Sequence, residues 1–287
     1  MNEAVRAMLG KYNCRSNDDY KNALKEIIQE IVLLGLSRTE FFNRASFYGG
    51  SALRIIHQLD RFSEDLDFSL VNRDSGFSFK PYLQAVQDEA IAFGFSVDVS
   101  VKEKTNNSAV ESAFLKGNTV EHLLLFPEIG KIDSSFNKND QIKIKIEIDK
   151  EPPIVDGDTE VRYLLMPIPF SLRVYDLPSL FAGKLHAILC REWKSRVKGR
   201  DYYDLCWYTA RRTPVNYNYL TSKLQQSGRI PADVNCGPEL LRQLLHDKIQ
   251  DVDIEQAKRD VQVFLRHPHA VDTWSTRFFE EIVSLIG

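Results

Sequence analysis

The sequence predicts an α+β fold, with a mixed-sheet domain over residues 1–175 followed by an all-helical domain over residues 176–287. Segments in which apolar and polar residues alternate, as in half-buried strands, are confined to the first part. After residue 175, apolar residues recur at three- and four-residue steps instead, which is typical of helices. We therefore expect the domain boundary near residue 175.

A helix and a strand–glycine–helix unit are predicted at the start of the first domain. Residues 17–36 carry helical spacing, and Ser16 or Asn17 suits the N-cap. Phe-Tyr-Gly-Gly at residues 47–50 predicts a strand that enters a tight turn, and residues 51–58 resume helical spacing. Two glycines are thus expected where this strand meets its helix.

Further strands and one hairpin complete the first domain. The segments with strand alternation are residues 65–70, 95–101, 141–150, 161–166 and 170–174. Residues 79–92 favour a helix, and residues 111–126 favour a hairpin that turns near Lys116-Gly117-Asn118.

The second domain is predicted to contain helices only. They are expected at residues 178–192, 201–211, 237–249, 254–265 and 272–286. His267-Pro268-His269 is expected to form a loop between two of them.

Composition excludes several classes of protein. The chain has 287 residues, of which 43% are hydrophobic and 27% charged, so it is neither disordered nor collagen-like nor a coiled coil. A net charge of −3 argues against coating nucleic acid or an anionic membrane by bulk charge. Contact with either would need a local basic patch.

Cysteine usage and apolar runs favour the cytoplasm. Four cysteines without a CxxC pair are expected to be reduced thiols. The N-terminus lacks the apolar core of a signal peptide, and the longest apolar run, residues 27–36, is shorter than the roughly 20 residues of a membrane span.

Gly49-Gly50-Ser51 is a candidate phosphate-binding turn. Backbone N–H groups at a helix start are unpaired and carry the positive end of the helix dipole, which suits phosphate oxygens. Glycines permit a close approach of the phosphates, and Ser51 could add a hydroxyl donor. The alternative is an ordinary turn without a ligand.

Asp65 and Asp67 are candidate metal ligands. On a strand they share one face, about 6.5–7 Å apart along the chain. Neighbouring carboxylates repel each other unless cations lie between them, and a pair of Mg²⁺ ions is useful in phosphoryl chemistry. The alternative is a solvated face of the sheet.

A third carboxylate could come from the strand at residues 141–150. Glu147 and Asp149 share one face, and Glu147 is preferred because Ile146 and Ile148 hold it inside the strand. Ion pairs with Lys143 and Lys145 are the alternative for both acids.

Two blocks of sequence resemble one family. Gly49-Gly50-Ser51, thirteen residues and then Asp65-Leu66-Asp67 resemble the DNA polymerase β-type nucleotidyltransferases. Residues 47–70 look like the first motif of the AbiEii/AbiGii toxin family, whose relatives include the MenT toxins. A second block, Lys184-Leu185-His186-Ala187 followed by residues 198–205, resembles two helices of that family.

The resemblance implies a transferase that moves NMP from an NTP to an acceptor with Mg²⁺ or Mn²⁺ and releases pyrophosphate. It implies the toxin of a type IV toxin–antitoxin or abortive-infection system active in phage defence, with a cognate antitoxin. Relatives modify tRNA acceptor ends, so the tRNA 3′ end is the expected acceptor. The alternatives are transfer to a small molecule or protein side chain, and a non-catalytic binding module.

The resemblance also implies residue roles. NTP binding falls to Gly49, Gly50, Ser51, Ser63, Arg200 and Asp204. Catalysis falls to Asp65, Asp67, Lys184 and Asp201, and metal binding to Asp65 and Asp67. Glu147 joins the metal ligands by strand pattern and not by motif.

Residues 181–212 supply a basic patch, since eight Lys/Arg minus three Asp/Glu leave +5. Five aromatic residues, Trp193, Tyr202, Tyr203, Trp207 and Tyr208, interleave with these charges. Basic side chains beside stackable rings suit an RNA end or an NTP base. The alternative is that the rings pack inward while the charges stay in water.

Overall fold

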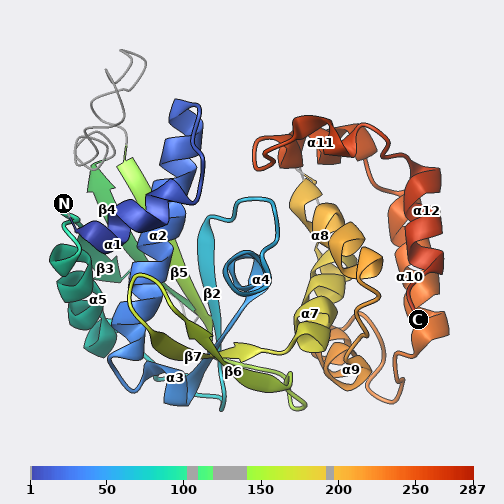
Figure 1. Cartoon of the computed structure of the whole chain (residues 1–287). Helices are drawn as coiled ribbons and strands as arrows, with labels where there is room; N and C mark the ends of the chain where they lie inside the picture. The colour runs from blue at the N-terminus through green and yellow to red at the C-terminus, as the bar shows by residue number, and fades with distance from the viewer. Residues whose placement is uncertain (1, 102–108, 119–140, 192–196) are drawn as a thin grey trace. The chain divides into compact units, whose positions relative to one another are not determined.

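The computed structural model describes residues 2–101, 109–118, 141–191 and 197–287 (Figure 1). This part of the chain forms two compact units. Unit 1 comprises Met1–Ile56, Phe62–Pro152 and Val161–Val174, and unit 2 comprises His57–Arg61, Pro153–Glu160 and Tyr175–Gly287. The chain passes from unit 1 to the main part of unit 2 between Val174 and Tyr175. Two short earlier segments, His57–Arg61 and Pro153–Glu160, also belong to unit 2, whereas the sequence analysis placed them in the first domain.

A seven-stranded mixed sheet organises unit 1, in the order β3-β4-β5-β2-β1-β7-β6. Its strands are β1 Ala45–Tyr48, β2 Asp65–Leu70, β3 Asp98–Val101, β4 Val110–Asn118, β5 Gln141–Asp149, β6 Thr159–Leu164 and β7 Phe170–Tyr175. β2 lies between β1, its antiparallel neighbour, and β5, its parallel neighbour. Because β2 is central, Leu66 and Phe68 are fully buried on the face opposite Asp65 and Asp67.

Unit 1 also contains helices. They are α1 Glu3–Gly10, α2 Asn17–Ser37, α3 Phe41–Arg44, α4 Gly49–His57 and α5 Lys80–Ala92. Of these, α2, α3 and α5 contact strands of the sheet. A capping box between Ser16 and Asp19 starts α2. Gly35 lets α2 approach α5 closely, since a Cβ there would lie 2.7 Å from the Cα of Val86.

Unit 2 is built from helices. They are α7 Leu177–Cys190, α8 Gly199–Ala210, α9 Tyr217–Gln226, α10 Pro238–Gln250, α11 Ile254–Gln262, the 3₁₀ helix η1 Pro268–Val271 and α12 Thr276–Ser284 (Figure 1). The start of α8 touches α11: the amide of Gly199 donates to Asp260 Oδ2 at 3.0 Å. A Cβ on Gly199 would lie 1.8 Å from the carbonyl oxygen of Ala257, so only glycine fits there.

The fold class is confirmed, with some corrections. The prediction of a hairpin turn near Lys116-Gly117-Asn118 is wrong, because these residues lie inside β4 and pair with Gln141–Lys143 of β5. Residues 119–126 of that prediction lie outside the described part. Three helices were not predicted, namely α1, α3 and α9, and Pro268 begins η1 where a loop was expected.

Two expectations concern the compartment. None of the helices in the described ranges has both the length and the apolarity needed to cross a membrane. All four cysteines are free thiols.

Candidate active site

The junction of β1 and α4 brings a glycine against a carboxylate in unit 1. Gly49 has φ = 81°, a left-handed conformation that side chains rarely adopt. A Cβ on Gly49 would lie 2.6 Å from Asp67 Oδ2 and 3.2 Å from Asp67 Cβ. The approach follows from the sheet register, in which Tyr48 is the Cα partner of Asp67. The glycine turn and the Asp67 carboxylate therefore share one corner of unit 1.

The first turn of α4 presents its backbone amides at this corner. Gly49, Gly50 and Ser51 are its first three residues. Their N–H groups have no partner within the helix and carry the positive end of its dipole. Farther along α4, Arg54 Nε donates to Glu26 Oε2 of α2 at 2.7 Å, which holds the helix against unit 1. The arrangement suits an anion placed at the amides.

Ser51 connects this helix start to β2. Its side chain is fully buried, and its hydroxyl donates to the carbonyl oxygen of Asp65. The hydroxyls of Ser51 and Ser63 are 2.9 Å apart. Since the hydroxyl has one proton, which goes to the carbonyl, Ser51 fixes the position of Asp65 and offers a ligand its backbone amide instead.

Three carboxylates follow one face at the centre of the sheet. Asp65 and Asp67 are half-buried on β2, and Glu147 on β5 is the Cα partner of Asp67. The Glu147 carboxylate accepts from Ser112 Oγ at 3.0 Å, and its Oε2 lies 2.6 Å from Lys145 Nζ. Asp149 pairs with Ser69, farther along the strand.

Carboxylate oxygens match the preference of Mg²⁺, which is held by one or two carboxylates together with substrate phosphates. Asp65 and Asp67 provide such a pair. In the described ranges, no three His, Cys, Asp or Glu side chains converge as a metal-binding group.

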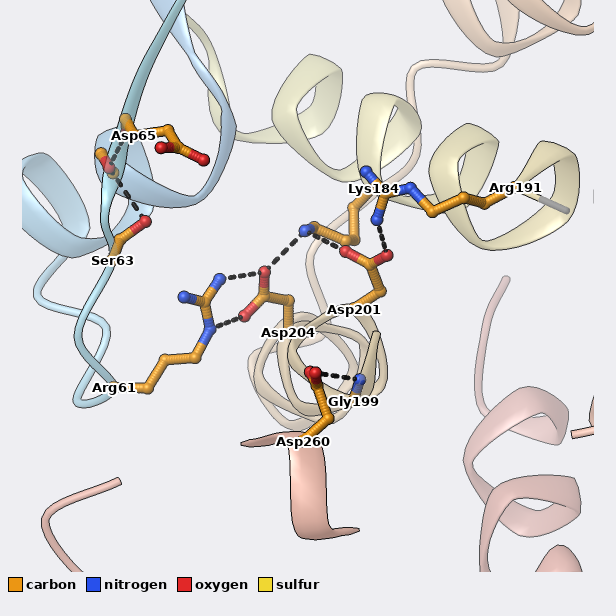
Figure 2. A network of polar contacts seen from close by, with 10 residues as sticks. Arg61, Ser63, Asp65, Lys184, Arg191, Gly199, Asp201, Asp204 and Asp260 are labelled. Atoms are coloured by element: carbon orange, nitrogen blue, oxygen red, sulfur yellow. Dashed lines mark hydrogen bonds and ion pairs between the residues drawn. The ribbon is translucent and has the colours of Figure 1, made fainter. Parts of the chain in front are cut away.

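Unit 2 contains a separate network of charged residues around α7 and α8 (Figure 2). Lys184 Nζ lies 2.8 Å from Asp201 Oδ1 and 2.8 Å from Asp204 Oδ2. Lysine and both acids are largely buried, with side-chain exposures of 12%, 7% and 0%. Asp201 and Asp204 lie about one helical turn apart on α8, so both carboxylates can contact the same lysine.

Arg61 completes the network from the segment His57–Arg61. Its Nε and Nη2 donate to the two carboxylate oxygens of Asp204, each at 2.6 Å. Burial alone would lower the pKa of Arg61, but Asp204 raises it, so the guanidinium stays charged. A buried bidentate pair of this kind fixes both side chains.

Arg191 adds a third cation to the network. It donates to Asp201 Oδ2, so Arg61, Lys184 and Arg191 all contact Asp201 or Asp204. Burial would raise the pKa of Asp201, but Lys184 and Arg191 outweigh it and lower the pKa to about 2. Asp201 therefore stays ionised at neutral pH and holds Lys184 and Arg191 in place.

The aromatic residues of this region are mostly packed inward. Tyr202, Trp207 and Tyr208 are at most 8% exposed, so for them the inward alternative is correct. Tyr203 is half-buried, and Arg200 lies over the ring of Phe264, 4.1 Å from its centroid. Trp193, Lys194 and Arg196 lie outside the described residues.

Comparison with known proteins decides the family. The model of the family described as "Nucleotidyl transferase AbiEii toxin, Type IV TA system" matches residues 31–277. The chain belongs to this family. AbiEii membership makes it a nucleotidyltransferase, with an NTP as substrate, and the toxin of a type IV system, which implies an antitoxin.

Two solved structures from Helicobacter pylori share the AbiEii chain's fold. One, described as a candidate nucleotidyltransferase, is 18% identical with a TM-score of 0.51, covering 94% of this chain and 92% of that one. The other, JHP933, is 17% identical with a TM-score of 0.52, covering 95% and 90%. The search of curated proteins found no match.

Sequence reasoning missed Arg61 of this network and counted Arg191 only as part of the basic patch at residues 181–212. Arg61 lies inside the segment that carries the resemblance, two residues before Ser63. The signal that could have found it was charge balance: a buried acid such as Asp204 requires a cation, and Lys184 was already shared with Asp201.

Proposed function

We propose that this AbiEii toxin transfers NMP from an NTP to the 3′ end of a tRNA in a reaction that depends on Mg²⁺ or Mn²⁺. The single observation that carries the proposal is the approach of Gly49 to Asp67. It joins amides suited to a triphosphate with a carboxylate suited to the triphosphate's metal ion. Phosphoryl transfer needs mainly such positioning and charge neutralisation.

Asp65 and Asp67 are the proposed metal ligands and Glu147 the proposed third. The register of Glu147 opposite Asp67 supports this choice over Asp149, which lies opposite Ser69. A bound divalent ion would neutralise phosphate charge and activate the acceptor hydroxyl. Ser51 is proposed to act through Asp65, whose carbonyl oxygen accepts from its hydroxyl, and Ser63 through its contact with Ser51.

The network of unit 2 is proposed to contribute positive charge. Lys184 is the proposed cation for the phosphates, with Asp201 and Asp204 as the carboxylates that hold it. The convergence of Arg61, Lys184 and Arg191 on the two acids supports this role. Arg200 remains a proposed NTP contact.

RNA as the acceptor rests on the family resemblance and on the local excess of Lys and Arg in residues 181–212. Salt-sensitive binding is expected, since phosphate contacts release counterions. We further propose action in the cytoplasm, consistent with four free thiols, and a role in abortive infection.

Labelled NTPs incubated with the purified chain and with separate pools of total RNA, protein and metabolites test the proposal. We expect label in the tRNA band, in the presence of Mg²⁺ or Mn²⁺, and its loss in Asp65→Asn and Asp67→Asn. Asp98→Asn, at an exposed acid of β3, is the matched control and should retain activity.

Two outcomes would contradict the proposal. Label that enters only protein or metabolites would replace RNA by another acceptor. Equal labelling and equal toxicity of folded Asp65→Asn and Asp67→Asn would indicate a binding module instead of an enzyme that uses these acids.

A further inference from the structure

Unit 2 contains a pocket that the proposed catalytic residues do not use. It has a volume of about 360 Å³ and lies among α8, η1, α12 and the segment His57–Arg61. This volume is near the lower end of the roughly 300–1,000 Å³ that small-molecule sites occupy. It therefore suits a ligand the size of a mononucleotide.

Aromatic rings form much of the pocket's lining. Trp207 of α8, Trp274 just before α12 and Phe278 within α12 all border it. The rings of Tyr203 and Trp274 lie 6.4 Å apart at 47°. Ring walls of this kind favour a flat aromatic ligand, which can stack on an open ring face or make edge contacts with a ring.

Asp60 places a carboxylate in the pocket. Tyr203 donates its hydroxyl to Asp60 Oδ1 at 2.7 Å. Burial and the hydrogen bond to Asp60 raise the pKa of Tyr203, so the phenol stays a donor at neutral pH and orients the acid. A carboxylate accepts about four hydrogen bonds, and one phenol leaves capacity for a donor on the ligand.

Arg211 supplies the opposite charge. Its guanidinium lies over the Trp207 ring, 3.9 Å from the centroid, and one N–H reaches the Trp207 carbonyl oxygen at 3.4 Å. Stacking uses the face of the guanidinium plane, whereas phosphate binding uses its edge. Arg211 is exposed, so it combines a defined position with access for an anion.

Two further residues of the lining bear on the pocket's role, one on ligand binding and the other on covalent chemistry. Gln58, which lines the pocket, has φ = 58°, and strained non-glycine residues gather at ligand sites. Burial raises the pKa of the Cys206 thiol to about 12, so this cysteine is a neutral part of the wall at physiological pH.

We propose that this pocket binds one unpaired nucleotide, with its base against the rings, an amine of the base on Asp60 and its phosphate on Arg211. A carboxylate only accepts hydrogen bonds, so bases with an exocyclic amine (adenine, cytosine and guanine) are preferred over uracil, which presents an acceptor there. The nucleotide comes from a free nucleoside monophosphate or from a single-stranded RNA end. The second source rests on the proposed function.

Calorimetry with AMP, CMP, GMP and UMP on the Asp65→Asn/Asp67→Asn chain tests the pocket apart from catalysis. We expect UMP to bind at least about 10-fold more weakly than the others. Asp60→Asn should remove this preference, because an amide can donate to uracil. Arg211→Gln should weaken AMP roughly 10-fold and leave unphosphorylated adenosine unchanged. A short RNA with a 3′-terminal adenine serves as the second ligand.

Controls separate the pocket from general effects. Arg229→Gln alters an exposed arginine outside both the pocket and residues 181–212, and should leave all affinities unchanged. Ala270→Trp at the exposed lining residue of η1 should block binding without disturbing the core. Circular dichroism verifies the fold of each variant.

The proposal is overturned if none of the four mononucleotides or the RNA binds, or if Ala270→Trp binds them as well as the parent chain. It is also overturned if Asp60→Asn keeps the discrimination against UMP. Labelling of tRNA by the wild-type chain would survive each of these results, so the pocket and the proposed function can fail independently. Binding of mononucleotides but not RNA supports the free nucleotide as the source.

Discussion

Gly49 and Asp67 adjoin so closely that a methyl group on the glycine would lie 2.6 Å from the Asp67 carboxylate. The contact arises because Gly49 follows Tyr48, the Cα partner of Asp67 across the antiparallel β1–β2 pair. A residue at position 49 thus sets both where α4 begins and where the Asp67 oxygens can lie. Any side chain there must displace one of the two.

Gly49→Ala is expected to reduce nucleotidyl transfer by about 100-fold, because small displacements of reacting groups cost that much. The variant should also lose about 1–3 kcal/mol of unfolding free energy from its left-handed backbone. Gly94→Ala provides the matched control, since Gly94 has φ = 89° but a methyl group there would meet no atom within 4 Å. Urea unfolding and NMP labelling measure both effects. Equal activity of the two variants would contradict a role for the Gly49–Asp67 contact.

Glu147→Gln is expected to weaken Mn²⁺ binding and to lower activity, because it removes a proposed ligand opposite Asp67. Asp149→Asn is the control: Asp149 Oδ1 accepts from the amide of Glu151 at 2.9 Å, and the asparagine oxygen preserves that bond. Mn²⁺ binding in the presence of NTP, followed by paramagnetic resonance, gives a readout separate from turnover. A larger loss in Asp149→Asn would move the third ligand to Asp149.

Arg61→Met is expected to lower the free energy of unfolding by about 3–5 kcal/mol, because it leaves the fully buried Asp204 without its bidentate partner. Arg61→Met/Asp204→Leu should recover much of this loss, since it removes both charges and leaves Lys184 with Asp201. Chemical unfolding of the two variants measures the difference.

A surface pair calibrates this experiment. Arg38 and Glu89 form an ion pair at 3.0 Å in which the arginine side chain is 50% exposed. Arg38→Met should cost at most about 1 kcal/mol. If Arg61→Met cost no more than Arg38→Met, Arg61 would not hold the charged network together.

Most of the sheet could be predicted because its strands alternate strictly. In β5, Ile142, Ile144, Ile146 and Ile148 are all fully buried, so the alternation records one buried face. The turn placed at Gly117 failed because glycine marks turns only on average, and here nine residues of β4 pair continuously with β5. Helix α9 was missed because its sequence, YNYLTSKLQQ, contains several weak helix formers and is fixed by packing.

The site could be predicted as a set of residue types but not as contacts. The spacing of Asp65 and Asp67 places them on one face of a strand. The alternation in residues 141–150 predicts β5 as a strand but does not say which strand pairs with it. That Glu147 faces Asp67 depends on the register between two strands that a long stretch of chain separates, and local patterns do not encode that register. The partnership of Arg61 with Asp204 joins residues 143 positions apart and is equally invisible to local reading.

Glu30 gives unit 1 a pH dependence in the neutral range. It lies on α2 one turn after Glu26, whose carboxylate accepts from Tyr12 and Arg54. Burial, and next the charge of Glu26, raise the pKa of Glu30 to about 8, although Lys11 and Arg54 act in the opposite direction. The folded chain therefore keeps this carboxyl protonated at pH values where the unfolded chain ionises it.

A raised folded-state pKa means that the stabilisation from Glu30 is complete below its unfolded value of 4.5 and is lost as the pH rises through about 8. Glu30→Gln, which stays neutral, should therefore gain unfolding free energy relative to wild type between pH 5 and pH 8.5, by at most about 1.4 kcal/mol per pH unit. Urea unfolding at pH 5, 7 and 8.5 measures this divergence. Glu40→Gln, at an exposed position, should parallel wild type, and parallel curves for Glu30→Gln as well would show that Glu30 ionises normally in the folded chain.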